Sequence, residues 1–171
     1  MRDVFGRTNE ILPKVWLSLA VPKSASEGWL NNLCHAAVQS ELPIFLARQA
    51  GLWGGGLRGC EAFLAEEASL SLAKATDKGH AFRLTQASLI QILSAIGRDR
   101  LDVLVLRIEE GVEEFQLDGF FQACLEATEE GHVRFLGLAS SENPYAALNA
   151  MQFRNAFDVL LASPKSIEVL G

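Results

Sequence analysis

The sequence contains few cysteines, a single tyrosine and an excess of acidic residues. Its 171 residues include three Cys, and 15 Lys and Arg stand against 21 Asp and Glu, which gives a net charge of −6. Cys34, Cys60 and Cys124 are widely spaced and form no C-x-x-C pair, which argues against both a disulfide framework and a zinc site. We therefore expect three structural thiols and no metal site. An acidic surface repels a phosphate backbone, so the composition does not favour nucleic-acid binding.

Long apolar runs are also missing. No stretch reaches the ~18 uninterrupted apolar residues that indicate a membrane span. Asp3, Arg7 and Glu10 fall where a signal peptide would have its apolar core. The sequence therefore predicts a cytoplasmic protein that does not bind membranes.

The segments that are present alternate between strand and helix patterns. The run LDVLVL (residues 101–106) is apolar at almost every position, which indicates a strand buried on both faces, as in parallel sheets. Before it lies a helix pattern with Thr85 as the expected N-cap and Gly97 as the stop, and a second helix pattern after it stops at Gly131. Further strands are expected over residues 15–21, 43–47, 132–138 and 157–161. Further helices are expected over 29–40, 61–70 and 144–153, with a helix end and short strand over 70–76.

About six strands thus alternate with about five helices in one domain, residues 1–171. Both an open doubly wound sheet and part of a (β/α)₈ barrel fit this pattern.

Several segments resemble aldo/keto reductases. FGRTNEILPKVWLSLAV is similar to the hairpin and first barrel strand of that family, and IGRDRLDVLVLRIEE, EEGHVRFLGLASSENP and FDVLL are similar to later strands. PIFLARQAGLWGGGLRGCEAFLAE is similar, more loosely, to the segment around the second strand. The five segments occur in the family's order and span nearly the whole chain. The resemblance implies an incomplete TIM (β/α)₈-type barrel with about six parallel strands and outer helices, and an NADP-dependent carbonyl or aldehyde reductase ancestry.

The family's catalytic Asp, Tyr, Lys and His do not all carry over. The Asp falls on Leu46, the Tyr falls near Gly51 to Trp53, and the His falls on Arg107. The Lys corresponds best to Lys78 of ATDKGHAF. A guanidinium stays protonated at ordinary pH, so Arg107 is no substitute for a proton-relaying His.

The cofactor-binding part of the resemblance is also incomplete. The Ser-Asn pair that contacts the nicotinamide is matched by Ser140 and Ser141, and the following Gln by Leu161. The resemblance ends at the sixth strand, so the last two βα units have no counterpart. A (β/α)₈ domain usually needs ~250 residues. We therefore expect NADP binding to be weak or absent, and we expect the two open sheet edges to favour self-association or a protein partner.

Two other segments offer alternative sites. GGGLRG, from Gly54 to Gly59, fits G-x-G-x-x-G with Asp77 18 residues later, and as a dinucleotide fingerprint it would need a helix starting near Cys60. The alternative is a loop that binds nothing. The acidic residues Glu109, Glu110, Glu113 and Glu114 are either a ligand site or a solvated turn before a helix.

The pattern of losses favours a catalytically degenerate aldo/keto reductase-like protein that acts as a binding or regulatory subunit, or is a relic. The alternatives are a diverged NADP-dependent oxidoreductase acting on a carbonyl or aldehyde, and a dinucleotide-binding domain that uses the Gly54–Gly59 loop.

Overall fold

The order of the strands decides between the two architectures. In the computed structural model, which describes residues 2–108, 111–140, 150 and 155–161, five strands form one sheet in the order β3-β4-β5-β6-β7, and every neighbouring pair is parallel. A doubly wound sheet reverses its order at a switch point, whereas a barrel adds strands in chain order. The described sheet is therefore the curled half of a (β/α)₈-type barrel, and the fold predicted from the sequence is confirmed.

The strands of this sheet differ in length. They are β3 (Ile44–Phe45), β4 (Leu64–Glu67), β5 (Leu101–Ile108), β6 (Val133–Ser140) and β7 (Val159–Leu161). The strand expected over residues 15–21 is reduced to one parallel bridge between Leu17 and Ile44, which continues the sheet beyond β3. Five strands and this bridge match the number of strands that the sequence predicts, but β4 is not among the predicted strands.

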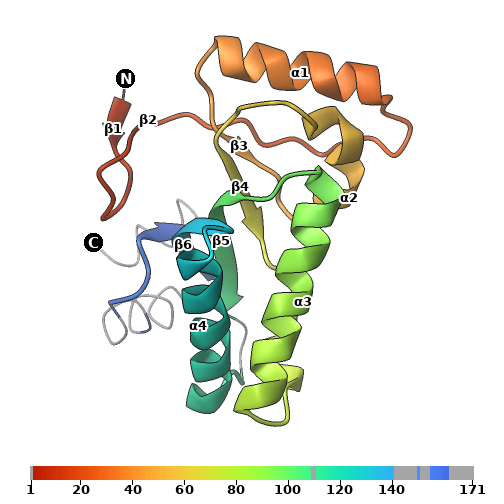
Figure 1. The fold of residues 1–171 in the computed structure, drawn as a ribbon. Helices are drawn as coiled ribbons and strands as arrows, with labels where there is room; N and C mark the ends of the chain where they lie inside the picture. The colour runs from red at the N-terminus through yellow and green to blue at the C-terminus, as the bar shows by residue number, and fades with distance from the viewer. Residues whose placement is uncertain (1, 109–110, 141–149, 151–154, 162–171) are drawn as a thin grey trace.

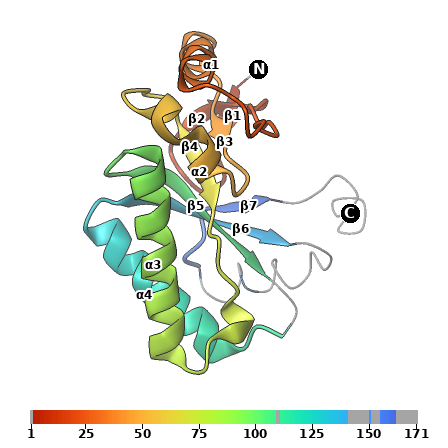
Figure 2. The ribbon, with the colours of Figure 1, turned by 90° about the vertical axis from the view of Figure 1, so that its right-hand side faces the viewer.

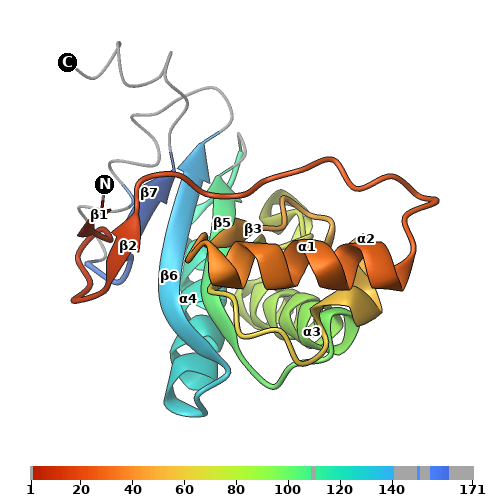
Figure 3. The same cartoon turned by 90° about the horizontal axis from the view of Figure 1, so that it is seen from above.

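Helices cover the outer face of the sheet. They are α1 (Glu27–Gln39), α2 (Ala50–Trp53), α3 (Lys78–Ile96) and α4 (Glu114–Glu129), with short 3₁₀ turns η1 (Gly54–Leu57) and η2 (Leu72–Lys74). Figures 1 and 2 show α3 and α4 side by side against the sheet. The hairpin of β1 (Arg2–Val4) and β2 (Ile11–Pro13) lies on the other side of the sheet from α1, α2 and α3 (Figure 3).

Both faces of the central strands are buried, as the continuous apolar run of β5 predicts. Leu104 and Leu106 point outward into the core under the helices. Val103 and Val105 point inward and pack with Ala65 and Ala139 in the barrel interior. Side chains alternate along a strand, so residues two apart share a face. This alternation fixes which residues near the strand ends face the interior.

The N-terminal hairpin closes the interior at the amino ends of the strands. The ring of Phe5 lies 5.2 Å from that of Trp16 and 5.7 Å from that of Phe63. The backbone N–H of Arg7 donates to the carbonyl of Asp158 at 2.8 Å. The opposite, carboxyl-terminal ends of the strands remain as the face where barrel enzymes place their sites.

The segment expected to be a helix over residues 61–70 is instead strand β4. Leu, Ala and Glu all favour helices, which explains the wrong prediction. Pairing with β3 on one side and β5 on the other overrides that preference. The following segment, expected to contain a short strand, holds η2.

The start of α3 also differs from the sequence prediction. Thr85 is not an N-cap: it lies buried within the helix and donates its hydroxyl to the carbonyl of Ala81 at 2.9 Å. The N-cap is Asp77, whose carboxylate accepts the backbone N–H of His80 at 2.7 Å. The predicted stop is correct, because Gly97 has φ 65°, a left-handed conformation that favours glycine.

The expectation of three free thiols is wrong. A disulfide joins Cys34 of α1 to Cys60, with the two Cα atoms 6.3 Å apart, and only Cys124 among the three is free. The two bonded residues are 26 positions apart, so their spacing gives no signal. They meet because α1 packs closely on η1, where a Cβ on Gly56 would lie 2.3 Å from the Cβ of Leu30.

Candidate functional site

A cluster of charged side chains lies at the carboxyl-terminal ends of β3, β4 and β5. Its centre is Glu67, the last residue of β4, whose side chain is 3% exposed. Arg107 of β5 donates two hydrogen bonds to this carboxylate, from Nε at 2.8 Å and from a terminal nitrogen at 2.7 Å. This bidentate geometry is the strongest form of the Arg–carboxylate pair. The hydrogen bond to Glu67 raises the pKa of Arg107 above its ordinary value, so this guanidinium stays charged.

A second guanidinium contacts the same carboxylate. Arg48 lies three residues after the end of β3, and its terminal nitrogen lies 2.5 Å from Oε1 of Glu67. Ala47 and Arg48 both have positive φ, 52° and 64°, a conformation that non-glycine residues rarely adopt. The left-handed turn re-aims the chain after β3 and brings Arg48 to the end of β4.

The neighbouring carboxylate of Glu66 holds this turn in place. Its oxygens accept the backbone N–H groups of Arg48 at 2.6 Å, Ala50 at 2.9 Å and its own neighbour Glu67 at 2.7 Å. Glu66 is 1% exposed, and burial raises its pKa although three backbone groups donate to it. Because side chains alternate along β4, Glu66 faces the helix layer while Glu67 faces the interior.

The sequence candidates are only partly brought together. Arg107 lies in the cluster, but Lys78 is the first residue of α3, and Glu67 is the side chain that pairs with Arg107. Ser140 is the last residue of β6, and its backbone pairs with Ile108. Ser141 lies outside the described residues.

The positions matched to the family's Asp and Tyr in the sequence comparison are apolar. Leu46 is fully buried in the core under the helices. Gly51 and Trp53 belong to α2, and Trp53 is fully buried. Neither position offers a group that exchanges a proton.

The dinucleotide fingerprint is wrong. No helix begins near Cys60, since residues 60–63 lead directly into β4. Gly54 and Gly56 lie in the turn η1, whose close packing on α1 needs a residue without a side chain. Asp77, the acidic residue that followed the glycine motif in that interpretation, caps α3. The Gly54–Gly59 segment is therefore a packing turn.

The acidic segment after β5 is described only in part, because Glu109 and Glu110 lie outside the described residues. Glu113 is the N-cap of α4 in a capping box with Gln116, whose Oε1 accepts the Glu113 N–H at 2.8 Å. Glu114 follows in the first turn, where an acidic residue favours the helix dipole. In the residues that the structure describes, no group of three or more His, Cys, Asp or Glu is arranged to hold a metal ion.

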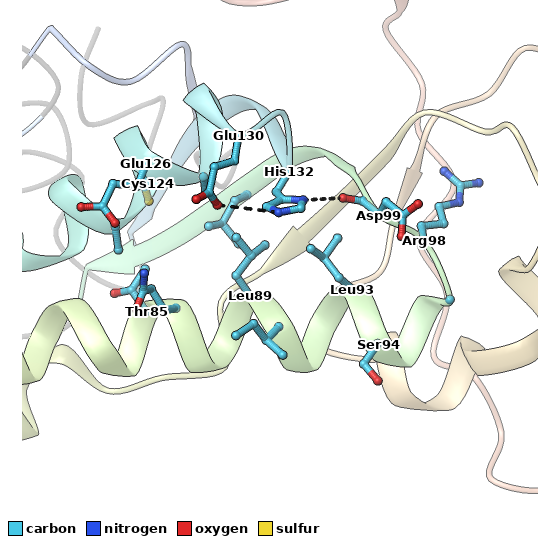
Figure 4. A pocket seen from close by; sticks show the side chains of 16 residues that line it. Thr85, Leu89, Leu93, Ser94, Arg98, Asp99, Cys124, Glu126, Glu130 and His132 are labelled. Atoms are coloured by element: carbon cyan, nitrogen blue, oxygen red, sulfur yellow. Dashed lines mark hydrogen bonds and ion pairs between the residues drawn. The ribbon is translucent and has the colours of Figure 1, made fainter.

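An apolar groove of about 530 Å³ lies between α3 and α4, on the outside of the barrel (Figure 4). Leu89, Leu93 and Cys124 line it, and at one end His132 Nδ1 lies 2.9 Å from the carbonyl oxygen of Asp99. Burial raises the pKa of the Cys124 thiol, so this side chain is not a ready nucleophile. The lining of the groove reaches the amino ends of β5 and β6, at the opposite end of these strands from the charged cluster.

The sequence missed Arg48, Glu66 and Glu67. Two adjacent carboxylates in an otherwise apolar segment are the signal that could have found them, because central strands rarely carry unpaired acidic residues. Once residues 61–70 are read as a helix, that signal disappears.

Comparison with known proteins supports the fold. No family model and no curated protein matches the sequence. Among solved structures, the holo form of aldo-keto reductase AKR11C1 from Bacillus halodurans has a TM-score of 0.71 at 13% identity, over 95% of this chain and 55% of that one. The thermostable aldo-keto reductase Tm1743, in complex with the inhibitor epalrestat, has a TM-score of 0.71 at 15% identity, over 95% and 62%. The aldo-keto reductase MGS-M4, from a Medee basin deep-sea metagenome library, has 0.67 at 18% identity, over 94% and 58%.

The chain has the fold of an aldo-keto reductase over less than two thirds of the length of these structures. The resemblance read from the sequence is thus confirmed at the level of the fold. Within the described residues, no helix is long and apolar enough to cross a membrane.

Proposed function

We propose that this chain is an aldo/keto reductase-like protein without reductase activity that acts as a binding or regulatory subunit. The observation that carries the proposal is the Glu67–Arg107 ion pair at the carboxyl-terminal mouth of the barrel. Hydride delivery to a carbonyl builds negative charge on oxygen, and a positioned acid must supply a proton as that charge forms. A guanidinium whose pKa is raised by Glu67 is a poor proton donor near neutral pH.

Among the described residues of this mouth, no side chain fits the role of the proton donor that reduction of a carbonyl by a nicotinamide requires. Both groups that contact Glu67 are guanidiniums, and the position matched to the family's Asp is the buried Leu46. We also propose that NADP binding is weak or absent.

A titration with NADPH tests the cofactor part. A ligand that binds the folded state must raise its stability according to the ratio of ligand concentration to Kd. We expect no change in Tm and no change in NADPH fluorescence at micromolar cofactor. A clear shift would refute this part.

An aldehyde panel with NADPH tests the catalytic part. The wild type is compared with the Lys78→Met, Arg107→Leu double variant, and we expect no turnover by either. Turnover by the wild type that the double variant loses would establish the second candidate, a diverged NADP-dependent oxidoreductase. The observation that favours this candidate is the fold, which aligns with a reductase solved in its holo form over 95% of this chain.

The partner part of the proposal concerns the sheet edges. Among the described strands β7 pairs only with β6, and at the other edge Leu17 makes one bridge to Ile44. Val15, two residues from that bridge, is 68% exposed. Open edges with exposed apolar residues favour pairing with a second copy or another protein.

Light scattering after size-exclusion chromatography tests this association. We expect an oligomer that Val15→Lys weakens. Ile90, which is 66% exposed on α3, supplies the matched control, because Ile90→Lys changes apolar exposure equally away from the edge. A wild type that stays monomeric at high concentration, or equal effects of both variants, would contradict the edge as the contact.

A further inference from the structure

We infer that Arg48 and Arg107, both held by Glu67, form a binding site for a small oxyanion, a carboxylate or phosphate group. The inference rests on the proposed function, since it names the ligand class for the same mouth of the barrel. The first observation is the number of N–H donors on the two guanidiniums. Each guanidinium has five N–H donors, and a carboxylate accepts only a few of them.

The contacts of Glu67 leave most of those donors unused by it. Arg107 gives it Nε–H and one terminal N–H, and Arg48 contributes a single terminal nitrogen. In the described part of the chain, no other carboxylate contacts Arg48 or Arg107. Their side chains are 43% and 32% exposed, so the remaining donors reach solvent at the mouth.

The charges of the cluster favour an anion. On the interior face two cationic side chains share one anionic side chain. Glu66 does not cancel this excess, because it faces the helix layer and its carboxylate is occupied by three backbone N–H groups. A planar guanidinium fork matches carboxylate and phosphate oxygens in two-point contacts, and two forks around one position increase that match.

The backbone gives an independent reason to regard the cluster as a site. Two consecutive residues, Ala47 and Arg48, are held in left-handed conformations, each of which costs about 1–3 kcal/mol. The buried Glu66 secures that turn through the N–H groups of Arg48 and Ala50. The Glu67–Arg107 pair is complete without Arg48. The strain therefore serves to bring a second guanidinium to the mouth, and strain of this kind gathers at functional sites.

The test measures the stabilisation of the full chain by inorganic phosphate and by acetate, with NaCl at equal ionic strength as the reference. The key variant is Arg107→Lys, which keeps the positive charge and loses the fork. Arg134→Lys is the matched control: Arg134 is 33% exposed, against 32% for Arg107, and pairs with Asp102, but it lies at the other end of the strands.

We expect phosphate, acetate or both to raise the Tm of the wild type and of Arg134→Lys beyond the effect of NaCl. The better of the two anions identifies the ligand group. Arg107→Lys should bind that anion about 10-fold more weakly, since a bidentate contact becomes a single one. Glu67→Gln should bind it more tightly, because the competing internal carboxylate has lost its charge. A merely structural network predicts no such gain.

Equal responses of Arg107→Lys and Arg134→Lys, or anion effects no larger than that of NaCl, would overturn the inference. This failure is distinct from failure of the proposed function, which the aldehyde panel reports. Turnover in the aldehyde panel refutes the proposal that the protein lacks reductase activity, whatever the anion result. Absent anion binding without turnover refutes only the proposed anion site.

Discussion

Arg107→Leu is expected to destabilise the fold substantially, because it removes two hydrogen bonds from a carboxylate that is 3% exposed. Breaking a buried ion pair by removing one partner costs about 3–5 kcal/mol. Arg107 is 32% exposed and Arg48 stays beside Glu67, so the expected loss is smaller, about 2–3 kcal/mol. For a chain of this length that loss lowers Tm by roughly 4–12 °C.

Urea and thermal unfolding of three variants measure this loss. Lys14→Gln removes the exposed pair between Lys14 and Asp3, whose side chains are 51% and 66% exposed, and should leave stability nearly unchanged. The double variant Glu67→Leu, Arg107→Leu leaves no unpaired charge from the pair and should recover most of the loss. The reasoning fails if Arg107→Leu is as mild as Lys14→Gln, or if the double variant is less stable than Arg107→Leu.

Three further predictions concern packing, redox state and pH. Gly56→Ala should destabilise the fold by about 1–3 kcal/mol, because its Cβ would lie 2.3 Å from that of Leu30. Gly51→Ala, which has open space around it, should be neutral or stabilising. The urea midpoints of the two variants measure the difference. Unfolded without reductant, the protein should show one reactive thiol, Cys124, and three after reduction; three before reduction would exclude the disulfide. Burial raises the pKa of Glu66, so the contribution of this group to stability is present below the ordinary value of 4.5 and is lost as pH rises through the folded pKa. The stability of the wild type relative to Glu66→Gln should therefore fall over that pH range. A difference that stays constant with pH would contradict the raised pKa.

The parts of the fold that the sequence predicts well are those where local signals and tertiary contacts agree. The apolar run at residues 101–106 lies within β5 and is buried on both faces. Gly97 and Gly131 have positive φ, 65° and 78°, at the ends of α3 and α4, where the sequence places stops. In each case one residue or one short run contains the whole signal.

Long-range contacts explain the failures. LAEE of β4 has a helical composition and becomes a strand only because β3 and β5 lie on either side of it. Cys34 and Cys60 are brought together by the packing of α1 on η1, and their spacing contains no trace of that packing. Both failures concern segments whose conformation depends on neighbours distant in the chain.

For the same reason, the sequence predicts only Arg107 among the residues of the charged cluster. Arg107 was found because it lies in a strongly predicted strand whose resemblance to the aldo/keto reductase family placed it at a catalytic position. Its partner Glu67 lies 40 residues earlier, in the segment that was wrongly predicted as a helix. Arg48 reaches the cluster through a left-handed turn at Ala47 and Arg48, where the sequence has no glycine to indicate such a turn. A pair across two strands becomes visible only when both strands and their register are known.

The side chains inside the barrel are arranged in layers, which is consistent with a shared fold at 13–18% identity to the aldo-keto reductase structures. Below the charged cluster, Ala65, Val103, Val105 and Ala139 form an apolar interior layer that stabilises the sheet. The cluster lies one layer further along the strands, at the face where barrel proteins vary their chemistry while the rest of the barrel maintains the fold. The guanidinium–carboxylate network makes the mouth polar and lies outside the apolar layer. The similarity in fold does not establish a reaction, and the proposed anion site depends on the unused donors of Arg48 and Arg107.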